Sequence, residues 1–552
     1  MADAPLSPGR LGPVDLVRWW VALAGLLLAP RIGPMIHPGR VTVLPDACVL
    51  LVVGWALGQV GAPPRSRWPS WRAWLLAVPW AAAGVFEAFR AALRYATNEE
   101  LPVYDGVLLS KHLYVLARDL YGGWAPAAVV ALALSPFAIT AVGAVLFGEL
   151  ERVGRRAGPV GGAVMAAAPA LLALGSAWMP KAWWTAEVAA VSVQRSFELF
   201  DTVRRELATR SHAELEGITL ERRPDVVFYI VESYGRVVEQ DPDYAAKWAP
   251  EVDASEARLR ERGWSFASTW MVAPVHGGRS WIADTSLLLG VRVQHQSDYE
   301  HVLSLVDRRP SLVTFFERQG YTSVLVKPTD RERPGVALEN PFGFDRTVFA
   351  VDLDYEGPIV GWGQIPDQYT IEYVQENLLD AIDAPRFAFF HLATAHLPWT
   401  PAPPLVQHWS EWATMTGADR PVFETRSLKS EIAMRMSRFK RKLDVDSNKK
   451  VRSGDDYLAD VQYDLAAIEQ RLSSPYARPT VVIVMGDHQP PVVAKDLNDD
   501  VPLHVLANDP RLLEPLIAAG FTPTYRPRGA TSTLEHRDLY PLLAHTLDEA
   551  AP

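Results

Sequence analysis

The sequence predicts a bundle of about five transmembrane helices followed by an α/β domain, whose mostly parallel central sheet is covered by helices on both faces. Long apolar segments are concentrated in the first 180 residues of the 552-residue chain. The remainder holds short, continuously apolar runs separated by helix-like stretches, which is typical of buried parallel strands. The length also exceeds what a single hydrophobic core usually supports, so we expect at least two domains.

Five apolar segments have roughly the length that crosses a bilayer. They cover about residues 16–36, 42–60, 73–93, 124–148 and 158–179. Arginines such as Arg65, Arg67, Arg152 and Arg155 favour a cytoplasmic N-terminus, which places the domain after the fifth segment outside. We therefore expect a multi-pass membrane protein whose C-terminal domain lies on the external side.

The expected organisation has three parts. They are a transmembrane domain at 1–180, an amphipathic linker helix at 181–222 and a globular domain at 223–552. The net charge of −10 argues against a nucleic-acid partner, because phosphate backbones require clustered Lys and Arg. The single cysteine, Cys48, excludes an intrachain disulfide and a cysteine-based zinc cluster.

Five apolar runs in the second half predict the strands of the sheet. They are "DVVFYIVES" (225–233), "YTSVLVKPT" (321–329), "RFAFFHLATAH" (386–396), "PTVVIVMGDH" (479–488) and "VPLHVLAND" (501–509). Ligands of such sheets bind beyond the carboxyl ends of the strands. The side chains at or just past these ends are Glu232, His391, His396, Asp487 and His488.

An ionic side chain at the end of a buried strand is costly unless it is paired or bound to a metal. Asp487 and His488 follow one such strand, and Glu232 ends another in the same way. An Asp that caps a following helix, with a histidine beside it by chance, is the alternative interpretation of residues 487–488. The repetition of the pattern at Glu232 favours metal binding.

The pair "PDVVFYIVES" and, far downstream, "VVIVMGDHQPP" resembles the alkaline phosphatase/sulfatase superfamily. Within it the chain resembles the membrane-anchored branch of lipoteichoic acid synthases and phosphoglycerol and phosphoethanolamine transferases. The resemblance implies an alkaline-phosphatase-like catalytic domain after five spans of a bacterial-type inner (plasma) membrane, with that domain on the external or periplasmic side.

The resemblance also implies one divalent metal ion, Mn²⁺ or Zn²⁺, and a hydroxyl nucleophile. The implied ligands are Glu232, Ser280, Asp487 and His488, with Ser280 as the nucleophile. Ser280 lies in "APVHGGRSWIADTSLLLGV", at an expected helix start that favours anionic oxygens. A simple N-cap role for Ser280 is the alternative, and Thr285 and Ser286 remain alternative nucleophiles.

Further residues are candidates for substrate contacts. His396 in "HLATAHLPW" resembles the substrate-side histidine of the family, and Trp362 and Asp367 in "GWGQIPDQY" resemble a pocket-lining stretch. Arg279 is a candidate phosphate clamp. His504 is a candidate for a second metal or for phosphate, with a buried core histidine equally open. His391 is expected to be structural.

The function that follows is transfer of a phosphoglycerol- or phosphoethanolamine-type group from a membrane phospholipid to an envelope glycan or lipid. The reaction would pass through a phosphoryl-serine. A phosphodiesterase or phosphatase, and an inactive sensor or scaffold, are the alternatives. Sulfate-ester hydrolysis through formylglycine is not expected, because Trp281 follows Ser280 where that chemistry requires a Cys/Ser-x-Pro-x-Arg sequence.

Overall fold

The computed structural model divides the chain into two compact units, residues 1–198 and 199–552. Each unit is described by itself. The structure describes residues 69–97, 102, 104–109, 125–177, 185–306, 309–330, 339–397, 399, 401–415, 450–491, 493–494, 497–529 and 533–550, with short pieces at 17–18, 22, 49–50 and 52–53.

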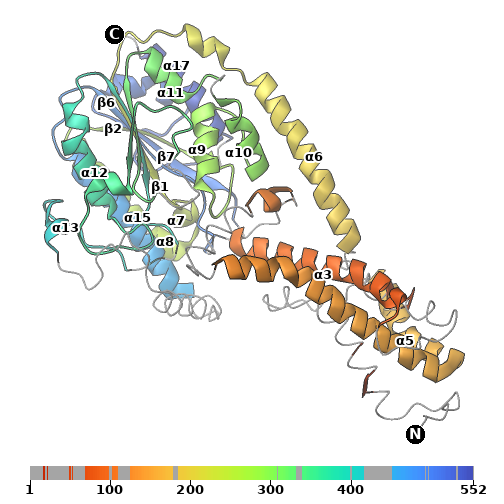
Figure 1. Ribbon diagram of the computed structural model, residues 1–552. Coiled ribbons are helices and arrows are strands. Elements are labelled where there is room, and N and C mark those ends of the chain that lie inside the picture. The colour runs from red at the N-terminus through yellow and green to blue at the C-terminus, as the bar shows by residue number, and fades with distance from the viewer. Residues whose placement is uncertain are drawn as a thin grey trace. The chain divides into compact units, whose positions relative to one another are not determined.

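Two long helices form the described core of the first unit. They are α3 (Trp71–Thr97) and α5 (Ala125–Ala177), which lie side by side (Figure 1). Their contact is close because Gly143 of α5 faces the ring of Trp80, where an added Cβ would lie 2.7 Å from a ring carbon. Phe147 and Ala77 are buried in the same cluster.

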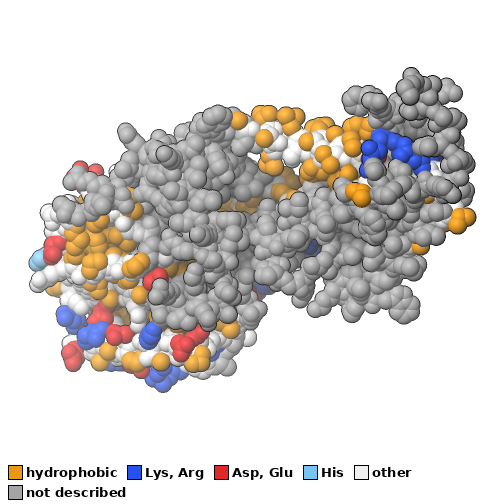
Figure 2. Space-filling model, turned by 90° about the horizontal axis from the view of Figure 1, so that it is seen from below, with side chains coloured by type: hydrophobic (Ala, Val, Ile, Leu, Met, Phe, Trp, Pro, Cys, Tyr) orange, Lys and Arg blue, Asp and Glu red, His pale blue; other side chains and the backbone are white. Residues whose placement is uncertain are grey.

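One helix among the described residues, Val130–Ala157, is long and apolar enough to cross a membrane, with a mean hydropathy of 2.2. Leu132 and Phe137 of α5 are exposed. Figure 2 shows hydrophobic side chains at the described surface of the molecule. The predicted third segment, 73–93, lies on α3. The segments 16–36 and 42–60, with Cys48, lie almost wholly outside the described residues.

The predicted break between the fourth and fifth apolar segments is wrong, because α5 continues without interruption through residues 149–157. The charged residues there stabilise the helix instead of ending it. Arg152 pairs with Glu149 at 2.5 Å and Arg155 with Glu151 at 3.2 Å, at the i,i+3 and i,i+4 spacings that support helices.

The second unit begins with the last turns of α6 (Thr185–Thr209), followed by η4 (Ala213–Gly217). Val203 and Leu207 of α6 are buried in one cluster with Ile282, and Glu206 binds Arg537 at 2.7 Å. The end of α6 is therefore an integral part of this unit.

A seven-stranded sheet forms the centre of the second unit, in the order β2-β7-β6-β1-β5-β3-β4. The expectation of a mostly parallel sheet is confirmed, because among these strands only β7 runs against its neighbours. The strands are β1 (Asp225–Val231), β2 (Ser265–Val272), β3 (Thr322–Lys327), β4 (Arg346–Phe349), β5 (Arg386–Leu392), β6 (Thr480–Gly486) and β7 (Asp500–Ala507).

Two of the seven strands were not predicted from the sequence. They are β2 and β4, which form the two edges of the sheet. β4 has only four residues, and β2 is interrupted by partly exposed positions, so neither has the continuous apolar pattern of a central strand.

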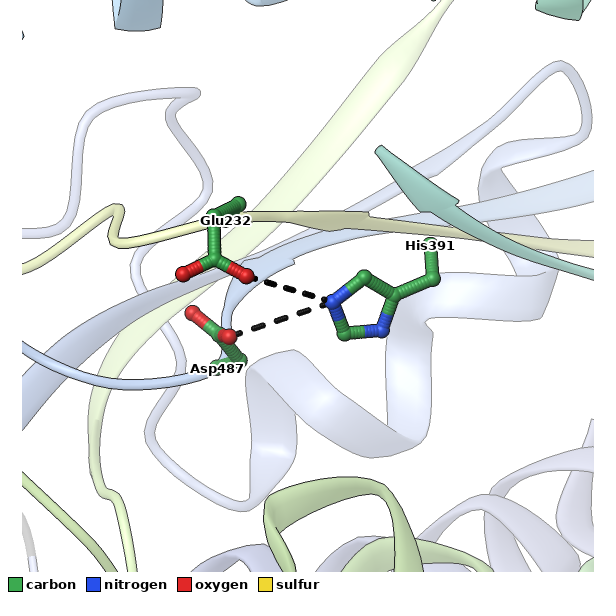
Figure 3. Close-up of side chains that lie close together, drawn as sticks. All are labelled: Glu232, His391 and Asp487. Atoms are coloured by element: carbon green, nitrogen blue, oxygen red, sulfur yellow. Dashed lines mark hydrogen bonds and ion pairs between the residues drawn. The ribbon is translucent and has the colours of Figure 1, made fainter. Parts of the chain in front are cut away.

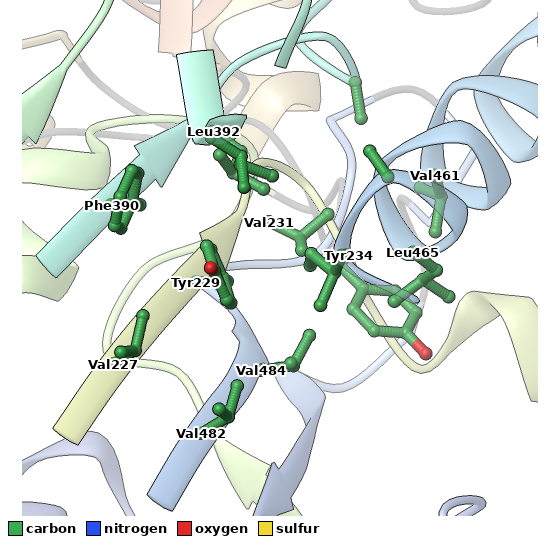
Figure 4. Packing of buried hydrophobic residues seen from close by; sticks show 14 of the residues in the cluster. Val227, Tyr229, Val231, Tyr234, Phe390, Leu392, Val461, Leu465, Val482 and Val484 are labelled. Carbon is green, nitrogen blue, oxygen red and sulfur yellow. The ribbon is translucent and has the colours of Figure 1, made fainter. Parts of the chain in front are cut away.

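Helices cover both faces of the sheet (Figure 1). The first face packs against α8 (Pro242–Glu261), α12 (Asp367–Asn377) and α15 (Lys450–Leu472), as Figure 4 shows for Val461 and Leu465 of α15 beside the valines of β1 and β6. The second face packs against α9 (Ser280–Leu289), α11 (Leu312–Arg318) and α17 (Leu539–Glu549). Other described elements are α7 (Val237–Gln240), α10 (Gln296–Leu303), η6 (Ala350–Leu353), η7 (Leu379–Ala381), α13 (Glu411–Thr414), η8 (Pro510–Leu513), α16 (Glu514–Ala518) and η9 (His536–Asp538).

Substituting Gly486 tests how closely the end of β6 approaches the chain after β1. A Cβ at this position would lie 1.9 Å from the carbonyl oxygen of Tyr234. We expect Gly486→Ala to lower the free energy of unfolding by about 3 kcal/mol or more, because backbone atoms would have to move. Gly217→Ala is the matched control, since nothing lies within 4 Å of its added Cβ. Equal urea-unfolding midpoints for the two variants would contradict the close approach.

Candidate active site

The site lies at the carboxyl edge of the sheet, where β1 and β6 end side by side. Val231 and Gly486 are register partners, so the next residues, Glu232 and Asp487, are neighbours. Side chains alternate between faces along a strand. Ile230 and Met485 are buried on the second face, so Glu232 and Asp487, two residues further on, continue toward the face that α9 covers. Both carboxylates are buried, at 4% and 1% exposure.

Asp487 is anchored through one of its two oxygens. Its Oδ1 accepts hydrogen bonds from the backbone N–H groups of Ser233 and His488, both at 2.8 Å. Its Oδ2 is buried and receives no hydrogen bond from the described residues. Ser233 adopts a φ of 59°, a conformation that is uncommon for residues other than glycine. The turn after β1 is thus held in a strained form around Asp487.

Ser280 reaches the carboxylates from a tight turn at the start of α9. The three residues before it, Gly277, Gly278 and Arg279, all have positive φ values. Gly277 also lies against Pro491, where a Cβ would be only 2.8 Å away. Ser280 Oγ donates to Glu232 Oε2 at 3.0 Å and lies 3.3 Å from His488 Nε2.

His488 completes the set of four ligands implied by the resemblance. Its Nδ1 lies 2.9 Å from the carbonyl oxygen of Gln489, which assigns a ring proton to Nδ1 and turns Nε2 toward the carboxylates. This Nε2 lies 3.2 Å from Asp487 Oδ2 and 3.3 Å from Glu232 Oε1. The structure therefore brings Glu232, Ser280, Asp487 and His488 together.

His391, which the sequence suggested to be structural, also joins this cluster. Its Nε2 faces Glu232 Oε2 at 3.5 Å and Asp487 Oδ2 at 3.9 Å (Figure 3). Its Nδ1 lies 3.1 Å from Asp284 Oδ2. The period of two along β5 is the signal that could have found it, because Phe387 and Phe389 are buried on the same face.

The charged groups of the cluster shift one another's pKa values. Burial and the Glu232 carboxylate raise the pKa of Asp487 to about 6. Burial alone would also raise the pKa of Glu232, but the neighbouring His396 and His488 hold it well below its usual value. Burial lowers the pKa of His488, but the Asp487 and Glu232 carboxylates outweigh it and raise the value to about 9. Such strong coupling is typical of functional sites.

The donor atoms fit a divalent cation by separation and by charge. A tetrahedral ion with bonds of 2.0–2.1 Å separates its ligand atoms by about 3.3 Å, and the distances of 3.0–3.3 Å around Ser280 Oγ and His488 Nε2 match this value. The carboxylates of Glu232 and Asp487 supply the negative charge that such a cation attracts. The buried Asp487 Oδ2 supplies an oxygen that lacks a hydrogen-bond donor among the described residues.

Two of the predicted substrate residues lie against each other. Trp362 stacks on His396 with ring centroids 3.8 Å apart, and the Trp362 side chain is 40% exposed. His396 Nδ1 lies 2.5 Å from the carbonyl oxygen of Leu397, and burial lowers the pKa of His396. Asp367 is fully buried at the start of α12, where its Oδ2 accepts from the backbone N–H groups of Ala393 and Thr394. Through these hydrogen bonds Asp367 holds the loop between His391 and His396 in place.

Other candidates are turned away from the carboxylates. Arg279 donates to the carbonyl oxygen of Gln294 at 3.1 Å. Thr285 and Ser286 are buried and donate to backbone carbonyl oxygens of their own helix at 2.7 and 3.0 Å. The contacts of α9 therefore favour Ser280 over its two rivals.

His504 is not brought to the cluster. It lies in the middle of β7, fully buried, with Nδ1 2.6 Å from the Tyr525 carbonyl oxygen and Nε2 3.1 Å from the Tyr234 hydroxyl. Its ring nitrogens are thus occupied within the core. These surroundings agree with the interpretation of His504 as a core histidine, which the sequence left open.

Fold and site together define an α/β domain with a mostly parallel sheet and an acid-histidine cluster at its carboxyl edge. The Sulfatase family model matches residues 286–543 of the chain. The matched region includes His391, Asp487 and His488 and begins after Glu232 and Ser280.

Several solved structures are similar to this chain, whereas no curated protein sequence matches it. The integral membrane lipooligosaccharide phosphoethanolamine transferase A of Neisseria meningitidis is 12% identical over 98% of this chain and 96% of that chain, with a TM-score of 0.44. The phosphoglycerol transferase GacH of Streptococcus pyogenes is 12% identical over 64% and 82%, with a TM-score of 0.34. The lipoteichoic acid synthase LtaP of Listeria monocytogenes is 12% identical over 60% and 76%, with a TM-score of 0.33.

The buried His504 makes stability depend on pH. Burial lowers its pKa to about 3 in the folded state, below the value of about 6.5 expected when unfolded. The unfolded state therefore binds the proton first as the pH falls, and this site removes about 1.4 kcal/mol of stability per pH unit between pH 6.5 and 3. We expect His504→Gln to be less stable at pH 7 but to lose less stability between pH 6.5 and 5, measured by urea unfolding. His545→Gln, at an exposed position of α17, is the control and should keep the wild-type slope.

Proposed function

We propose that the protein is a membrane-anchored, metal-dependent transferase of phosphorus-containing groups. It moves a phosphoglycerol- or phosphoethanolamine-type group from a lipid donor to an envelope glycan or lipid through a phosphoryl-serine intermediate. The observation that carries the proposal is the meeting of Ser280, at the start of a helix, with Glu232 and His488 at 3.0 and 3.3 Å. A hydroxyl held beside a general base is the arrangement of an activated nucleophile.

The first step uses Ser280 and its carboxylate partner. Ser280 Oγ forms a bond to phosphorus while the bond from phosphorus to the lipid alcohol breaks, and the departing lipid alkoxide takes a proton from water. Glu232 Oε2 is placed to accept the hydroxyl proton and to return it when Ser280 is released in the second step. The amino end of α9 carries a partial positive charge that favours the phosphoryl oxygens. A bound divalent cation, Mn²⁺ or Zn²⁺, held by Glu232, Ser280, Asp487 and His488, would supply Lewis-acid stabilisation of the negative charge.

The second step requires a group that accepts a proton from the incoming hydroxyl. His396 fits this role because its Nδ1 donates to the carbonyl oxygen of Leu397, and burial lowers its pKa, which favours the neutral form that can accept a proton. Trp362 holds the ring by stacking. A neutral imidazole suits proton acceptance better than the protonation of a leaving group that the sequence had suggested.

The lipid donor follows from the proposed location. The apolar helix Val130–Ala157 and the apolar segments of the first 180 residues support membrane anchoring. We propose a transmembrane domain at 1–180, a linker at 181–222 and a catalytic domain at 223–552 on the external or periplasmic side of the inner membrane. ATP is absent from that compartment, so a phospholipid is a suitable source of an activated phosphate ester.

Headgroup-labelled phospholipids test the nucleophile and the reaction together. The full chain in lipid nanodiscs is incubated with Mn²⁺ or Zn²⁺ and ³²P-labelled phosphatidylglycerol or phosphatidylethanolamine, and acid-quenched protein is mapped by peptide mass spectrometry. We expect label on Ser280 and a loss on the order of 1,000-fold or more in Ser280→Ala, because the other hydroxyls of α9 are bonded to its backbone.

Thr285→Val is the matched control, since it removes a buried hydroxyl of the same helix and should label as the wild type does. Label on Thr285 or Ser286 would move the nucleophile, and no label on any residue with either lipid would contradict the transferase. Release of the label into water in the presence of envelope glycans would support the hydrolase instead.

A further inference from the structure

Asp284 is a buried carboxylate close to the cluster without belonging to the ligands implied by the resemblance. It lies one helical turn after Ser280 on α9, so the two side chains share a face of the helix. Its exposure is 3%. A buried carboxylate is tolerated only when it is compensated by charge and hydrogen bonds, so its partners indicate its role.

Two nitrogen atoms from neighbouring strands meet one oxygen of Asp284. His391 Nδ1 lies 3.1 Å from Oδ2, and Lys327 Nζ lies 3.5 Å from the same atom. Val326 of β3 and Phe390 of β5 are register partners, so Lys327 and His391 follow as neighbours at the carboxyl edge. Asp284 therefore connects α9 with the ends of two strands.

The contact with Asp284 determines what the other nitrogen of His391 faces. Because Nδ1 is turned to Asp284, Nε2 points at Glu232 Oε2 and Asp487 Oδ2. Glu232, His391 and Asp487 offer ligand atoms that all lie within 4.8 Å of one another. A carboxylate that receives the Nδ1 proton of a histidine fixes the ring and strengthens Nε2 as a ligand.

We propose that Asp284 is a positioning residue of the cation site that acts through His391, and that His391 contributes its Nε2 to that site. The inference rests on the cation-binding part of the proposed function and needs no particular substrate. Lys327 balances the charge of Asp284 and does not itself hold the cation.

The test is a comparison of cation affinities in the full-length chain, purified in detergent and titrated with Mn²⁺ and Zn²⁺ against a competing chelator. We expect Asp284→Asn and His391→Gln each to weaken affinity by about 10–100-fold. The double variant should be no weaker than His391→Gln alone, because Asp284 acts through the ring. An Asp284→Asn effect that persists in full in the His391→Gln background would overturn the proposal in favour of simple charge attraction.

Lys327→Met is the matched control for the environment of Asp284. It removes a partner from the same oxygen, but it also removes a positive charge, so it should leave cation affinity unchanged or tighter. A loss equal to that of Asp284→Asn would mean that disturbed packing causes both effects and would overturn the proposal. Melting temperatures in chelator show whether each variant folds, and Asp284→Ser is measured in the same way if Asp284→Asn does not fold.

The results of these titrations distinguish a failure of the role proposed for Asp284 from a failure of the proposed transferase function. Cation affinity is measured without a substrate, so absent transfer activity leaves the role of Asp284 standing. Unchanged affinity in both Asp284→Asn and His391→Gln would overturn the role of Asp284 while the transferase stands. A wild-type chain that binds neither cation would overturn both.

Discussion

The site depends on two buried carboxylates that lie side by side because their strands are parallel and in register. Glu232 follows Val231 and Asp487 follows Gly486, and those two residues are partners in the sheet. Two like charges removed from water repel each other and lose hydration, which costs several kcal/mol per ion unless the surroundings compensate. The compensation comes from the backbone of Ser233 and His488, the hydroxyl of Ser280 and the facing imidazoles. The loops at this edge are shaped by that requirement.

The same requirement accounts for where the backbone is strained. Ser233 and Arg279 have φ values of 59° and 65°, and each is adjacent to a side chain of the cluster. A residue other than glycine in this region costs of order 1 kcal/mol or more, and it persists only when its surroundings hold it. Core packing on both sheet faces supplies that support, with Tyr234 and Gly486 in backbone contact behind Glu232. The core thus stabilises two strained turns. One directs the N–H of Ser233 to Asp487, and the other directs the hydroxyl of Ser280 to Glu232.

The sequence predicts the central strands because a continuous apolar run is typical of a strand that is buried on both faces. It also predicts Glu232, Asp487 and His488, which follow such runs. The position of His504 could not be deduced, because nothing in "VPLHVLAND" reveals that β7 runs antiparallel, so that its carboxyl end lies at the opposite edge. The choice among Ser280, Thr285 and Ser286 depends on the starting residue of α9, since each residue turns the helix by about 100°. His391 was within reach of the sequence, because it continues the inward-facing positions of β5.

Asp487 and the three histidines at this edge of the sheet each use one polar atom for anchoring and leave the other for chemistry. Asp487 Oδ1 accepts hydrogen bonds from two backbone N–H groups, whereas Oδ2 faces the cluster. The histidines follow the same rule, with Nδ1 bound to Gln489 in His488, to Leu397 in His396 and to Asp284 in His391. Every Nε2 is therefore left for a cation, a phosphoryl oxygen or a proton. Such anchoring fixes donor atoms before a ligand arrives, which removes the reorganisation cost that weakens flexible sites. His391 differs in that its anchor is a side chain, so its orientation depends on one charged residue of α9.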